Sequence, residues 1–409
     1  MTQSVVNHID VSGFDLAAPP PGFVDDPFPI YDALLHSAPV LPQPDGSVLL
    51  SRHADLDRVY RDTTLFISDK KAVFGPIFGV GSPLFEHHTT SLVFNDPPLH
   101  TRVRKIMTAA LTPRAIARME PGLINTVDDL LSRMADREQV DLITDFASSI
   151  PIQIIGNLLD VPRDERDPLR GWSLDILGAL EPSLTDAQLA RGHQAVRDFK
   201  LYLQDLIARR RADPGDPETD VLTRLIKGEG ADAQLSEIEL IQNCIFILNA
   251  GHETTTNLIG SALWLLDQDR DARACLIENP ALNTTAVDEF LRLESPNQFG
   301  NRLTTQELTL HGIRIPAGTD LHLCIGAANR DPAQFDDADV LRPDRRPNKH
   351  LAFAGGAHTC VGLTLARMEG RIAVSKFLEK FPNYRIAEGV ERAKRIRFRG
   401  FSKLPARLG

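Results

Sequence analysis

Residues 353–362 read Phe353-Ala354-Gly355-Gly356-Ala357-His358-Thr359-Cys360-Val361-Gly362. The glycines let the backbone pass close to a bulky, flat ligand. Cys360 stands just before a helix predicted over residues 363–377, so its sulfur lies near free N–H groups at a positive helix end, which favour thiolate over thiol. The pattern indicates a loop that presents a thiolate. The alternative is a glycine-rich turn around a buried cysteine. A zinc site is disfavoured because His350, His358 and Cys360 lack paired spacing.

The longest predicted helix begins after Ser236, which forms a capping-box pattern with Glu239, and its apolar spacing continues to about Leu266. Its middle, residues 249–256, combines a glycine, a run of β-branched threonines and a glutamate. Each of these is unfavourable inside a buried helix, and such locally costly sequences usually mark functional sites. A threonine hydroxyl here can bond the carbonyl of Ala250 and open the helix ladder. A threonine-rich kink without function is the alternative.

The remaining pattern predicts a mainly α (α+β) chain with small peripheral β-sheets. Helical periodicity is clear at residues 101–111, 121–135 and 186–212. Strand patterns occur at residues 47–50 and, as a hairpin, at 308–315, with 320–325 as the expected partner strand of that hairpin. No repeat or long linker interrupts the chain. We therefore expect a single domain over residues 1–409, with an irregular lead-in over about residues 1–25.

The composition excludes several classes of protein. The net charge is -10, which argues against nucleic acid as the main partner. No stretch approaches the ~18 apolar residues of a membrane span, and the N-terminus has no signal-peptide pattern. The cysteines show no disulfide framework, which suits a reducing compartment; they are Cys244, Cys275, Cys324 and Cys360. We expect a soluble, cytoplasmic protein that does not bind membranes.

The loop at residues 353–362 resembles the haem-binding loop of cytochromes P450 of the soluble bacterial type. That loop has Phe, Gly, a basic residue, Cys and Gly at these intervals, and Ala354 departs from it because glycine or serine is commoner there. The resemblance implies a P450 fold with a buried haem. It makes Cys360 the iron ligand, packs Phe353 near the sulfur and sets His358 beside a haem propionate.

Other motifs follow in the order of that family. Glu289-Phe290-Leu291-Arg292 is similar to its Glu-x-x-Arg motif, although an ordinary surface ion pair is the alternative. The resemblance adds Arg345 to Glu289 and Arg292 as a structural triad that holds the cysteine loop. The middle of the long helix resembles the family's acid–alcohol pair, which implies Glu253 and Thr254 as the catalytic, proton-delivering residues.

Further haem contacts are implied by the same resemblance. His100 and Arg104 are four residues apart, so they share a helical face, and both would reach haem propionates. Arg302 and His350 stand where the family supplies its other propionate contacts. For each residue taken singly, a surface salt bridge is the alternative.

The implied function is that of a haem-thiolate monooxygenase that inserts one oxygen atom of O2 into a small hydrophobic substrate. The cofactor would be haem b. Because no Gly-x-Gly-x-x-Gly fingerprint is present, electrons from NAD(P)H would arrive through a separate ferredoxin and ferredoxin reductase. A basic patch would receive the ferredoxin; its members are Arg102, Lys105, Arg114, Lys349 and Arg367. We expect a monomer. A peroxide-driven peroxygenase and a non-catalytic haem sensor are disfavoured by the Glu253–Thr254 pair.

The expected substrate is aromatic or an aromatic acid, undergoing hydroxylation or O-demethylation; a terpenoid or fatty-acid hydroxylase is the alternative. This expectation rests on phenylalanines among the candidate pocket residues, which are Phe74, Phe78, Phe85, Leu177, Phe246, Asn249, Ala250 and Phe299. The polar residues near the variable loop are expected to be solvent-exposed rather than to bind a carboxylate; they are Lys70, Lys71, His87 and His88.

Overall fold

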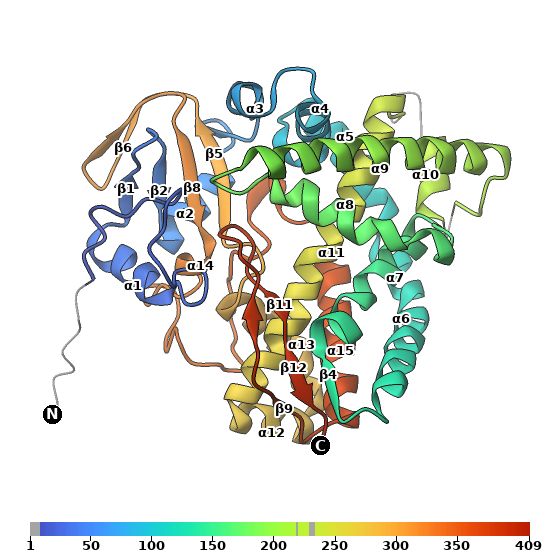
Figure 1. The fold of residues 1–409 in the computed structure, drawn as a ribbon. Helices are drawn as coiled ribbons and strands as arrows, with labels where there is room; N and C mark the ends of the chain where they lie inside the picture. The colour runs from blue at the N-terminus through green and yellow to red at the C-terminus, as the bar shows by residue number, and fades with distance from the viewer. Residues whose placement is uncertain (1–8, 218–219, 229–233) are drawn as a thin grey trace, which may run out of the picture.

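The computed structural model describes residues 9–217, 220–228 and 234–409 (Figure 1). The first eight residues of the predicted lead-in lie outside the described ranges. The α-helices are α1 (Phe28–Ser37), α2 (His53–Arg61), α3 (Lys71–Phe78), α4 (Pro83–Thr90), α5 (Leu99–Ala110), α6 (Pro113–Met134), α7 (Ser149–Leu158), α8 (Asp167–Gly178), α9 (Asp186–Ala212), α10 (Val221–Lys227), α11 (Glu237–Gln268), α12 (Arg270–Glu278), α13 (Asn283–Leu293), α14 (Ile325–Ala328) and α15 (Leu363–Lys380).

Short strands and single helical turns complete the chain. The strands are β1 (Val40–Pro42), β2 (Val48–Leu50), β3 (Phe66–Ile67), β4 (Gln139–Asp141), β5 (Phe299–Thr304), β6 (Leu308–Leu310), β7 (Ile313–Ile315), β8 (Asp320–Cys324), β9 (Arg385–Ile386), β10 (Glu391–Arg392), β11 (Phe401–Lys403) and β12 (Pro405–Arg407). The turns are η1 (Leu92–Phe94), η2 (Leu142–Ala147), η3 (Arg163–Glu165), η4 (Pro280–Leu282) and η5 (Gly356–His358).

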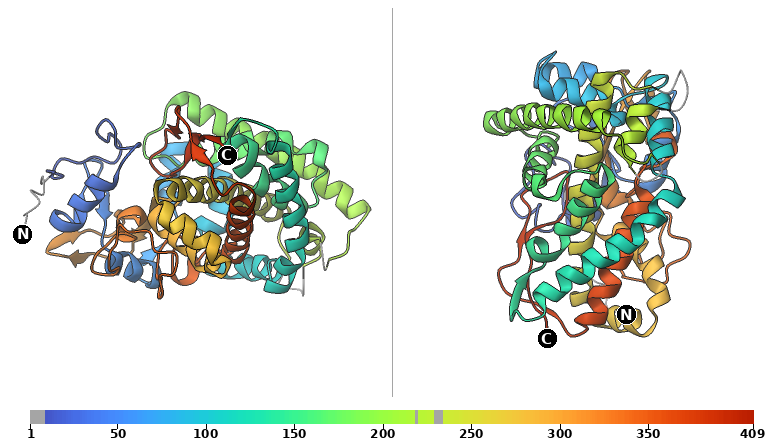
Figure 2. Two further views of the ribbon diagram at one scale, coloured as in Figure 1. Left: turned by 90° about the horizontal axis from the view of Figure 1, so that it is seen from below. Right: turned by 90° about the vertical axis from the view of Figure 1, so that its right-hand side faces the viewer.

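The long helix α11 runs through the middle of the helical half of the molecule (Figure 1). Its N-terminus carries the expected capping box, in which the Ser236 side chain accepts from the Glu239 backbone and the Glu239 side chain accepts from that of Ser236. Helix α9 begins with a second capping box, between Thr185 and Gln188, and crosses the end of α11 in both views (Figure 2). These local hydrogen bonds explain why both helices begin where the sequence predicts.

Two apolar clusters hold α11 in place. Towards its C-terminal end, Leu258, Ile259 and Leu263 are buried with Phe377 of α15 and Phe146 of η2. Its N-terminal end lies in the second cluster, with residues of α4, α5, α8 and α9. The middle of α11, which holds the costly sequence, lies between these clusters and borders the cavity described below. In the described ranges, no helix is both long and apolar enough to span a bilayer.

The largest sheet lies at the other side of the molecule (Figure 1), with the strand order β1-β2-β8-β5-β3. β8 pairs parallel with β2 and antiparallel with β5. The prediction that residues 320–325 pair with the 308–315 hairpin is therefore wrong. β6 and β7 pair only with each other among the described strands, through a turn at His311 and Gly312, which have φ of 48° and 82°.

The helix predicted over residues 121–135 is longer than expected, since α6 already begins at Pro113. Thr112 caps it by accepting a hydrogen bond from the Ala115 N–H, while Pro121 lies inside the helix rather than at its start. Pro121 therefore did not mark the start of the helix, whereas Pro113 stands in its first turn, where proline is common. From below, α15, α11 and α13 lie side by side as the core of the helical half (Figure 2), and α15 begins three residues after Cys360.

Candidate functional site

A cavity of about 350 Å³ lies between the helical half and the large sheet. Its walls come from distant segments, including the cysteine loop, the middle of α11, β5 and residues Arg397 and Phe398 near the C-terminus. Most of the lining is apolar, and the volume is typical of an enclosed ligand site. The cavity is therefore the place where a flat cofactor and a hydrophobic substrate would be held.

Cys360 lies on the cavity wall, and its side chain is accessible from the cavity. Its backbone N–H donates to the Phe353 carbonyl at 2.9 Å, which closes the loop into a compact hairpin-like turn. Burial raises the pKa of the Cys360 thiol, while the Gly362 backbone N–H and the charges of Arg104 and Arg367 act in the opposite direction. Burial outweighs these groups, so the pKa stays above its usual value and a bound metal ion would have to supply the stabilisation of the thiolate.

The backbone of the cysteine loop needs glycine at one position in particular. Gly356 has φ of +64°, and a Cβ there would collide with the Tyr60 carbonyl oxygen of α2. Ala354 also has a positive φ, 56°, at the position where the sequence departs from the family pattern. The loop thus packs against α2 through backbone atoms that cannot move aside.

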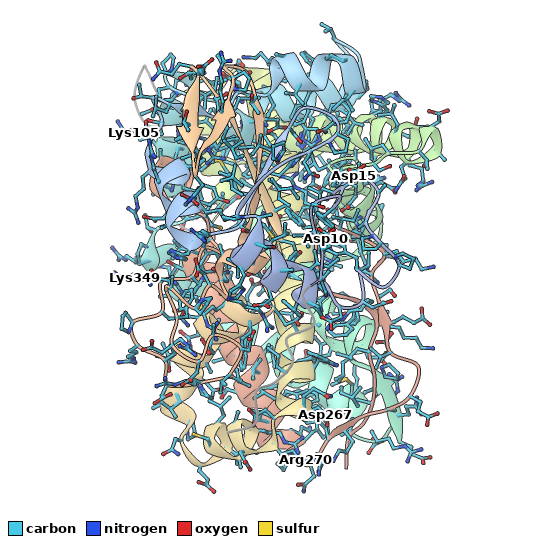
Figure 3. The ribbon with its side chains drawn as sticks, turned by 90° about the vertical axis from the view of Figure 1, so that its left-hand side faces the viewer. Asp10, Asp15, Lys105, Asp267, Arg270 and Lys349 are labelled. Carbon is cyan, nitrogen blue, oxygen red and sulfur yellow. The ribbon has the colours of Figure 1, made fainter. Side chains whose placement is uncertain are left out.

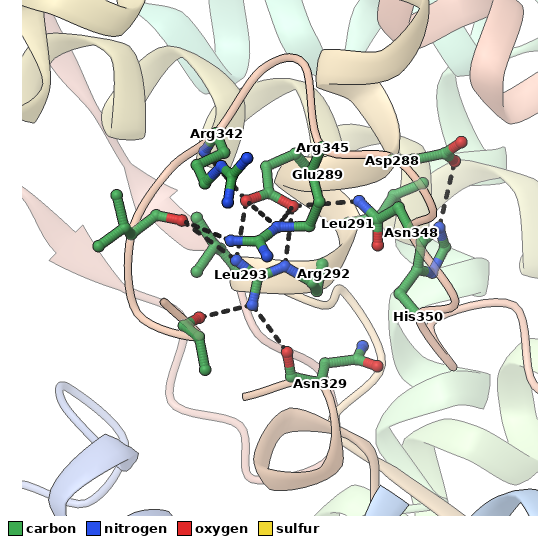
Figure 4. Close-up of polar contacts among 12 residues, drawn as sticks. Asp288, Glu289, Leu291, Arg292, Leu293, Asn329, Arg342, Arg345, Asn348 and His350 are labelled. Atoms are coloured by element: carbon green, nitrogen blue, oxygen red, sulfur yellow. Dashed lines mark hydrogen bonds and ion pairs between the residues drawn. The ribbon is translucent and has the colours of Figure 1, made fainter. Parts of the chain in front are cut away.

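Glu289, Arg292 and Arg345 form the expected triad of charges (Figure 4). Arg292 donates to both carboxylate oxygens of Glu289 at 2.8 Å, and Arg345 Nε lies 3.0 Å from Glu289 Oε1. Glu289 and Arg292 are fully buried, so this is not the surface ion pair that was the alternative. Arg292 also donates to the carbonyls of Asn329 and Ala338, which ties α13 to the chain leading into the cysteine loop.

The middle of α11 has the hydrogen bond that the sequence suggested. Thr254 Oγ1 donates to the Ala250 carbonyl at 2.7 Å, and both residues border the cavity. Thr256 makes the same type of bond to the His252 carbonyl at 2.9 Å but is not part of the cavity wall. Thr254 thus combines a hydrogen bond to the helix backbone with access to the cavity, although α11 remains a continuous α-helix at this point.

Glu253 is buried behind Thr254 and is paired with the C-terminal segment. Arg395 Nη1 lies 2.9 Å from Glu253 Oε2. Burial raises the pKa of Glu253 to about 7, with Arg395 lowering it and Glu181 raising it. A carboxyl that titrates near neutrality can hold a proton and pass it on.

A second buried acid links α11 to α15. Glu369 accepts a hydrogen bond from Thr255 Oγ1 at 3.4 Å, while its other oxygen has no partner among the described residues. Burial raises the pKa of Glu369 to about 8, so the neutral form predominates at neutral pH. No sequence signal pointed to this residue, because an isolated glutamate on a helix is usually exposed.

Two arginines lie beside the cysteine loop without acidic partners among the described residues, and His358 Nε2 lies 4.0 Å from Asp96 Oδ1. Arg104 donates to the Thr359 carbonyl at 2.7 Å, and Arg302 donates to the Asn301 carbonyl at 2.7 Å. In the part of the chain that is described, neither has a carboxylate in ion-pair contact. The rings of His100 and His358 lie 3.9 Å apart, and His100 Nε2 is buried without a partner.

This excess of positive charge is a test of the implied cofactor. Burial lowers the pKa of Arg302, and burial with Arg302, His100 and Arg104 lowers the pKa of His358 to about 2. Buried cations without anions are costly. Carboxylates inside the cavity would relieve that cost, so Arg104 and Arg302 fit the propionates of a haem, with the uncharged ring of His358 and the ring of His100 beside them.

His350 does not belong to this cationic group. Its Nε2 lies 3.1 Å from Asp288 Oδ1, as Figure 4 shows, and its Nδ1 lies 3.3 Å from the Ala352 N–H. It does not border the cavity. The expected propionate contact of His350 is therefore not supported, because both ring nitrogens are already engaged.

Half of the candidate pocket residues border the cavity and half do not. Leu177, Phe246, Asn249 and Ala250 line it. Phe74 and Phe78 instead pack against each other at 5.0 Å, and Phe85 packs partly buried in the same cluster. Phe299 packs edge-on against Tyr31 at 6.1 Å. For these four phenylalanines the prediction was wrong, since ordinary core packing takes up their rings.

The polar residues expected to be exposed near the variable loop are mostly buried. Lys70 is 2 % exposed and forms an ion pair with Asp320. His87 Nδ1 lies 2.9 Å from Gln242 Oε1, and His88 is buried on the cavity wall. Only Lys71 is exposed, so the expectation was wrong for the other three.

The model of the family "Cytochrome P450" matches residues 177–405. The chain is 40% identical over 318 residues to cytochrome P450 107B1 of Saccharopolyspora erythraea, covering 77% of this chain and 76% of that one. It is 34% identical over 394 residues to the vitamin D(3) 25-hydroxylase of Pseudonocardia autotrophica, covering 95% of each. The crystal structure of P450BioI in complex with hexadec-9Z-enoic acid ligated acyl carrier protein has a TM-score of 0.87 and 29% identity, covering 95% of this chain and 100% of that one.

Proposed function

Because the chain belongs to the cytochrome P450 family of haem-containing monooxygenases, we propose that it inserts one oxygen atom of O2 into a hydrophobic substrate bound between α11 and the cysteine loop. One observation carries the proposal: the Cys360 thiol and the Thr254 hydroxyl open into the same largely apolar cavity. In cytochromes P450 the bound haem b activates dioxygen, and donation from the cysteine thiolate, an established property of this family, favours cleavage of the O–O bond.

The chain's own residues would hold the cofactor from two sides. Cys360 would bind the iron, and the buried cations Arg104 and Arg302 would pair with the propionates. His100, whose Nε2 is buried without a partner among the described residues, would donate to the same carboxylates. His358 would lie beside them, with its Nε2 3.0 Å from Ser68 Oγ. Phe353, which lies on the cavity wall under the Arg367 guanidinium, would shield the sulfur from water.

Protons would reach the site through the acid–alcohol pair. Glu253 holds a proton for about half of the time near neutral pH, since its pKa is raised to about 7. Arg395 holds its Oε2, so the acid must rotate away from Arg395 or exchange protons through water to reach the cavity. Thr254 lies on the cavity wall and would hand the proton on through its hydroxyl.

The aromatic character expected of the substrate loses much of its support. The four phenylalanines that pack elsewhere leave Phe94, Phe246 and Phe398 as the aromatic walls on the substrate side, beside aliphatic Leu92, Leu177, Leu180 and Ile247. We retain aromatic acids as candidate substrates and set fatty acids and terpenoids beside them. The relatives' names include a vitamin D(3) hydroxylase and a complex with a fatty acyl carrier protein, which is the range this lining suits.

Electrons would come from a separate ferredoxin that is reduced through a reductase by NAD(P)H. Lys105 and Lys349 are exposed on one edge of the molecule (Figure 3), next to the segments that carry Arg104 and the cysteine loop. Arg114 is exposed at the start of α6. Arg102 is paired with Glu239 and Arg367 with Asp288, so these two contribute less positive charge than the sequence suggested.

The test compares Thr254→Ala with Thr256→Ala in the haem-loaded enzyme. Both variants lose the same kind of hydrogen bond to α11, but only Thr254 borders the cavity. With a ferredoxin, its reductase and NADH, Thr254→Ala should consume NADH and release hydrogen peroxide while losing most of its oxidised product. Thr256→Ala should keep the normal ratio of product to NADH.

Other outcomes separate the alternatives. If Thr254→Ala changed only the affinity for ligands and the enzyme formed no product, the protein would be a haem sensor. If product formed with hydrogen peroxide alone, as fast as with NADH and ferredoxin, it would be a peroxygenase. Equal ratios of product to NADH in both variants would contradict the role of Thr254.

A further inference from the structure

The cavity holds a cation that the haem contacts do not explain. Arg397 lies on its wall, next to Phe398. Its backbone N–H donates to Glu181 Oε2 at 3.1 Å, but its guanidinium has no hydrogen bond or ion pair within the described part of the chain. Burial lowers the pKa of Arg397, and the acids that act against this shift, Glu181 and Asp320, do so from a distance.

The nearest acids are engaged elsewhere. Asp320 is paired with Lys70. Glu181 Oε2 accepts from the backbone N–H groups of Ile396 and Arg397, which fixes the segment but leaves the guanidinium free. A guanidinium stays charged at physiological pH, so it carries an unpaired positive charge into an apolar cavity. Without an anionic ligand, this is an expensive arrangement.

Arg397 and Arg302 both act on Tyr60 and Lys70, but only Arg302 is among the charges that act on His358 beside the cysteine loop. His358 is influenced by Arg302, His100 and Arg104, which together with burial lower its pKa to about 2. Arg397 also acts on His88 of α4. The pKa of His88 lies well below its usual value because of burial and the charges of His87 and Arg397. Its segment is held through Glu181, just beyond α8, whose Leu177 also lines the cavity. Arg397 therefore also lies towards α4 and α8, where His88 and Leu177 line the cavity.

A neutral polar group lies beside it. Asn297 pairs with Phe398 as an isolated antiparallel bridge, and Gln298 N–H donates to the Arg397 carbonyl at 2.8 Å. Asn297 borders the cavity, and its buried side-chain oxygen has no partner in the described ranges. The oxygen and nitrogen of an amide can exchange places, so Asn297 can offer an N–H to a ligand. Its adjacency to an arginine fork suits a planar carboxylate.

We propose that Arg397, assisted by Asn297, binds a carboxylate of the substrate and so selects hydrophobic acids over their neutral analogues. This inference rests on the proposed monooxygenase function and adds the substrate class to it. The apolar walls accept the hydrophobic body, while the two polar groups hold the acid end. The position of the anchor then determines how far from the carboxylate the substrate is oxidised.

Spin-state titration of the ferric, haem-loaded protein tests the proposal with matched pairs. The probes are hexadecanoic acid with hexadecanol and cinnamic acid with cinnamyl alcohol, which separate fatty from aromatic acids. At least one acid should bind more tightly than its alcohol, by roughly tenfold to a hundredfold, as expected for hydrogen bonds to a charged group. Arg397→Gln should abolish that difference by weakening the acid alone, and Arg397→Lys should restore part of it.

Lys394→Gln is the matched control, because it removes an exposed positive charge from the same segment. It should leave both members of each pair unchanged. Equal affinity of every acid and alcohol for the unaltered protein would overturn the proposal. So would an equal loss for acid and alcohol in Arg397→Gln, or a loss of haem from that variant, which would make Arg397 structural or a propionate contact.

Failure of this proposal is distinguishable from failure of the proposed function. The ferrous–carbon monoxide spectrum reports thiolate ligation and does not depend on the substrate. If Arg397→Gln keeps that spectrum and still oxidises a neutral compound, the monooxygenase stands and only the carboxylate anchor is in question.

Discussion

Ala354 and Gly356 occupy the left-handed region of backbone space two residues apart, within the loop that carries Cys360. Gly356 is required twice over, by its φ of +64° and by the Tyr60 carbonyl that a Cβ would strike. Gly355 is required by neither, since its φ is -151° and its Cβ would meet Tyr60 Cβ at an ordinary 3.4 Å. Adjacent glycines with identical chemistry thus have unequal structural roles.

Alanine substitutions at these two glycines should separate their roles. Gly356→Ala should destabilise the haem-loaded protein by more than about 2 kcal/mol, because strain and a backbone clash add. Gly355→Ala should change the free energy of unfolding by less than about 1 kcal/mol. Urea denaturation followed by the haem absorbance measures both. Equal midpoints for the two variants would mean that the loop can shift away from α2.

Ala354→Gly should stabilise the protein. An alanine at φ of 56° pays a steric cost of roughly 1–2 kcal/mol that glycine avoids, partly offset by the greater freedom of glycine in the unfolded chain. We expect a gain of about 0.5–1 kcal/mol in the same denaturation measurement. Ala357→Gly, at a position of negative φ in the same loop, should instead lose about 0.4–1 kcal/mol. A loss in both variants would contradict strain at Ala354.

At the scale of elements, α11 and α15 meet through a buried acid that neither helix neutralises. Among the described residues, the side chain of Glu369 of α15 forms a hydrogen bond only with Thr255 of α11, and burial raises its pKa to about 8. Since the folded protein prefers the protonated acid, this group's contribution to stability is complete below about pH 4.5. It is lost progressively as the pH rises through about 8.

Glu369→Gln should remove that pH dependence. In the window between about pH 4.5 and about pH 8, the stability of the unaltered protein should fall relative to the variant by about 1.4 kcal/mol per pH unit at most. Thermal midpoints of the haem-loaded proteins across this window measure the difference. Glu379→Gln is the control, an exposed glutamate on the same helix that should show no such trend. Parallel curves for Glu369→Gln and the unaltered protein would show that the acid stays charged when folded.

The helices that could be predicted from the sequence are those whose ends are fixed by hydrogen bonds between neighbouring residues. The capping boxes at Ser236 and Thr185 fix α11 and α9 from a few neighbouring residues. The hydrogen bond from Thr254 to the Ala250 carbonyl could be predicted for the same reason, because it joins residues four apart on one helix. Pairing of β8 with β2, some 270 residues away, and the burial of Lys70 against Asp320 depend on tertiary packing that periodicity does not encode.

For the whole molecule, the cavity is closed by the last fifteen or so residues of the chain as much as by the predicted motifs. Arg395 pairs with Glu253, and Arg397 and Phe398 form part of the wall. Nothing in the sequence around these arginines distinguishes them from surface residues. Likewise, Phe74 and Phe299 are of a residue type that is common in substrate pockets, but their rings pack against other aromatic rings in the core. Motif residues could be found from sequence because they interact with a cofactor of fixed shape, whereas the substrate wall is specific to this chain.

Charge on the whole surface leads to a prediction about electron transfer. The chain has a net charge of -10, so an acidic ferredoxin is repelled by most of the surface and can approach only where positive charge is exposed. Lys105 and Lys349 lie on one edge of the molecule in Figure 3, while Arg270 lies at its lower end. Arg104, next to Lys105, donates to the Thr359 carbonyl, so this edge is only a few bonds from Cys360.

Reversing the charge at Lys105 and Lys349 together should therefore slow reduction by ferredoxin roughly tenfold at low ionic strength. The difference should shrink as salt is added, because exposed charges are screened beyond about 10 Å at 0.1 M salt. Arg270→Glu, which changes the net charge in the same direction at a distant site, should leave the rate nearly unchanged. Stopped-flow formation of the ferrous–carbon monoxide complex measures the rate. If Arg270→Glu slowed it as much per charge as the lysine reversals, net charge rather than a docking site would govern the encounter.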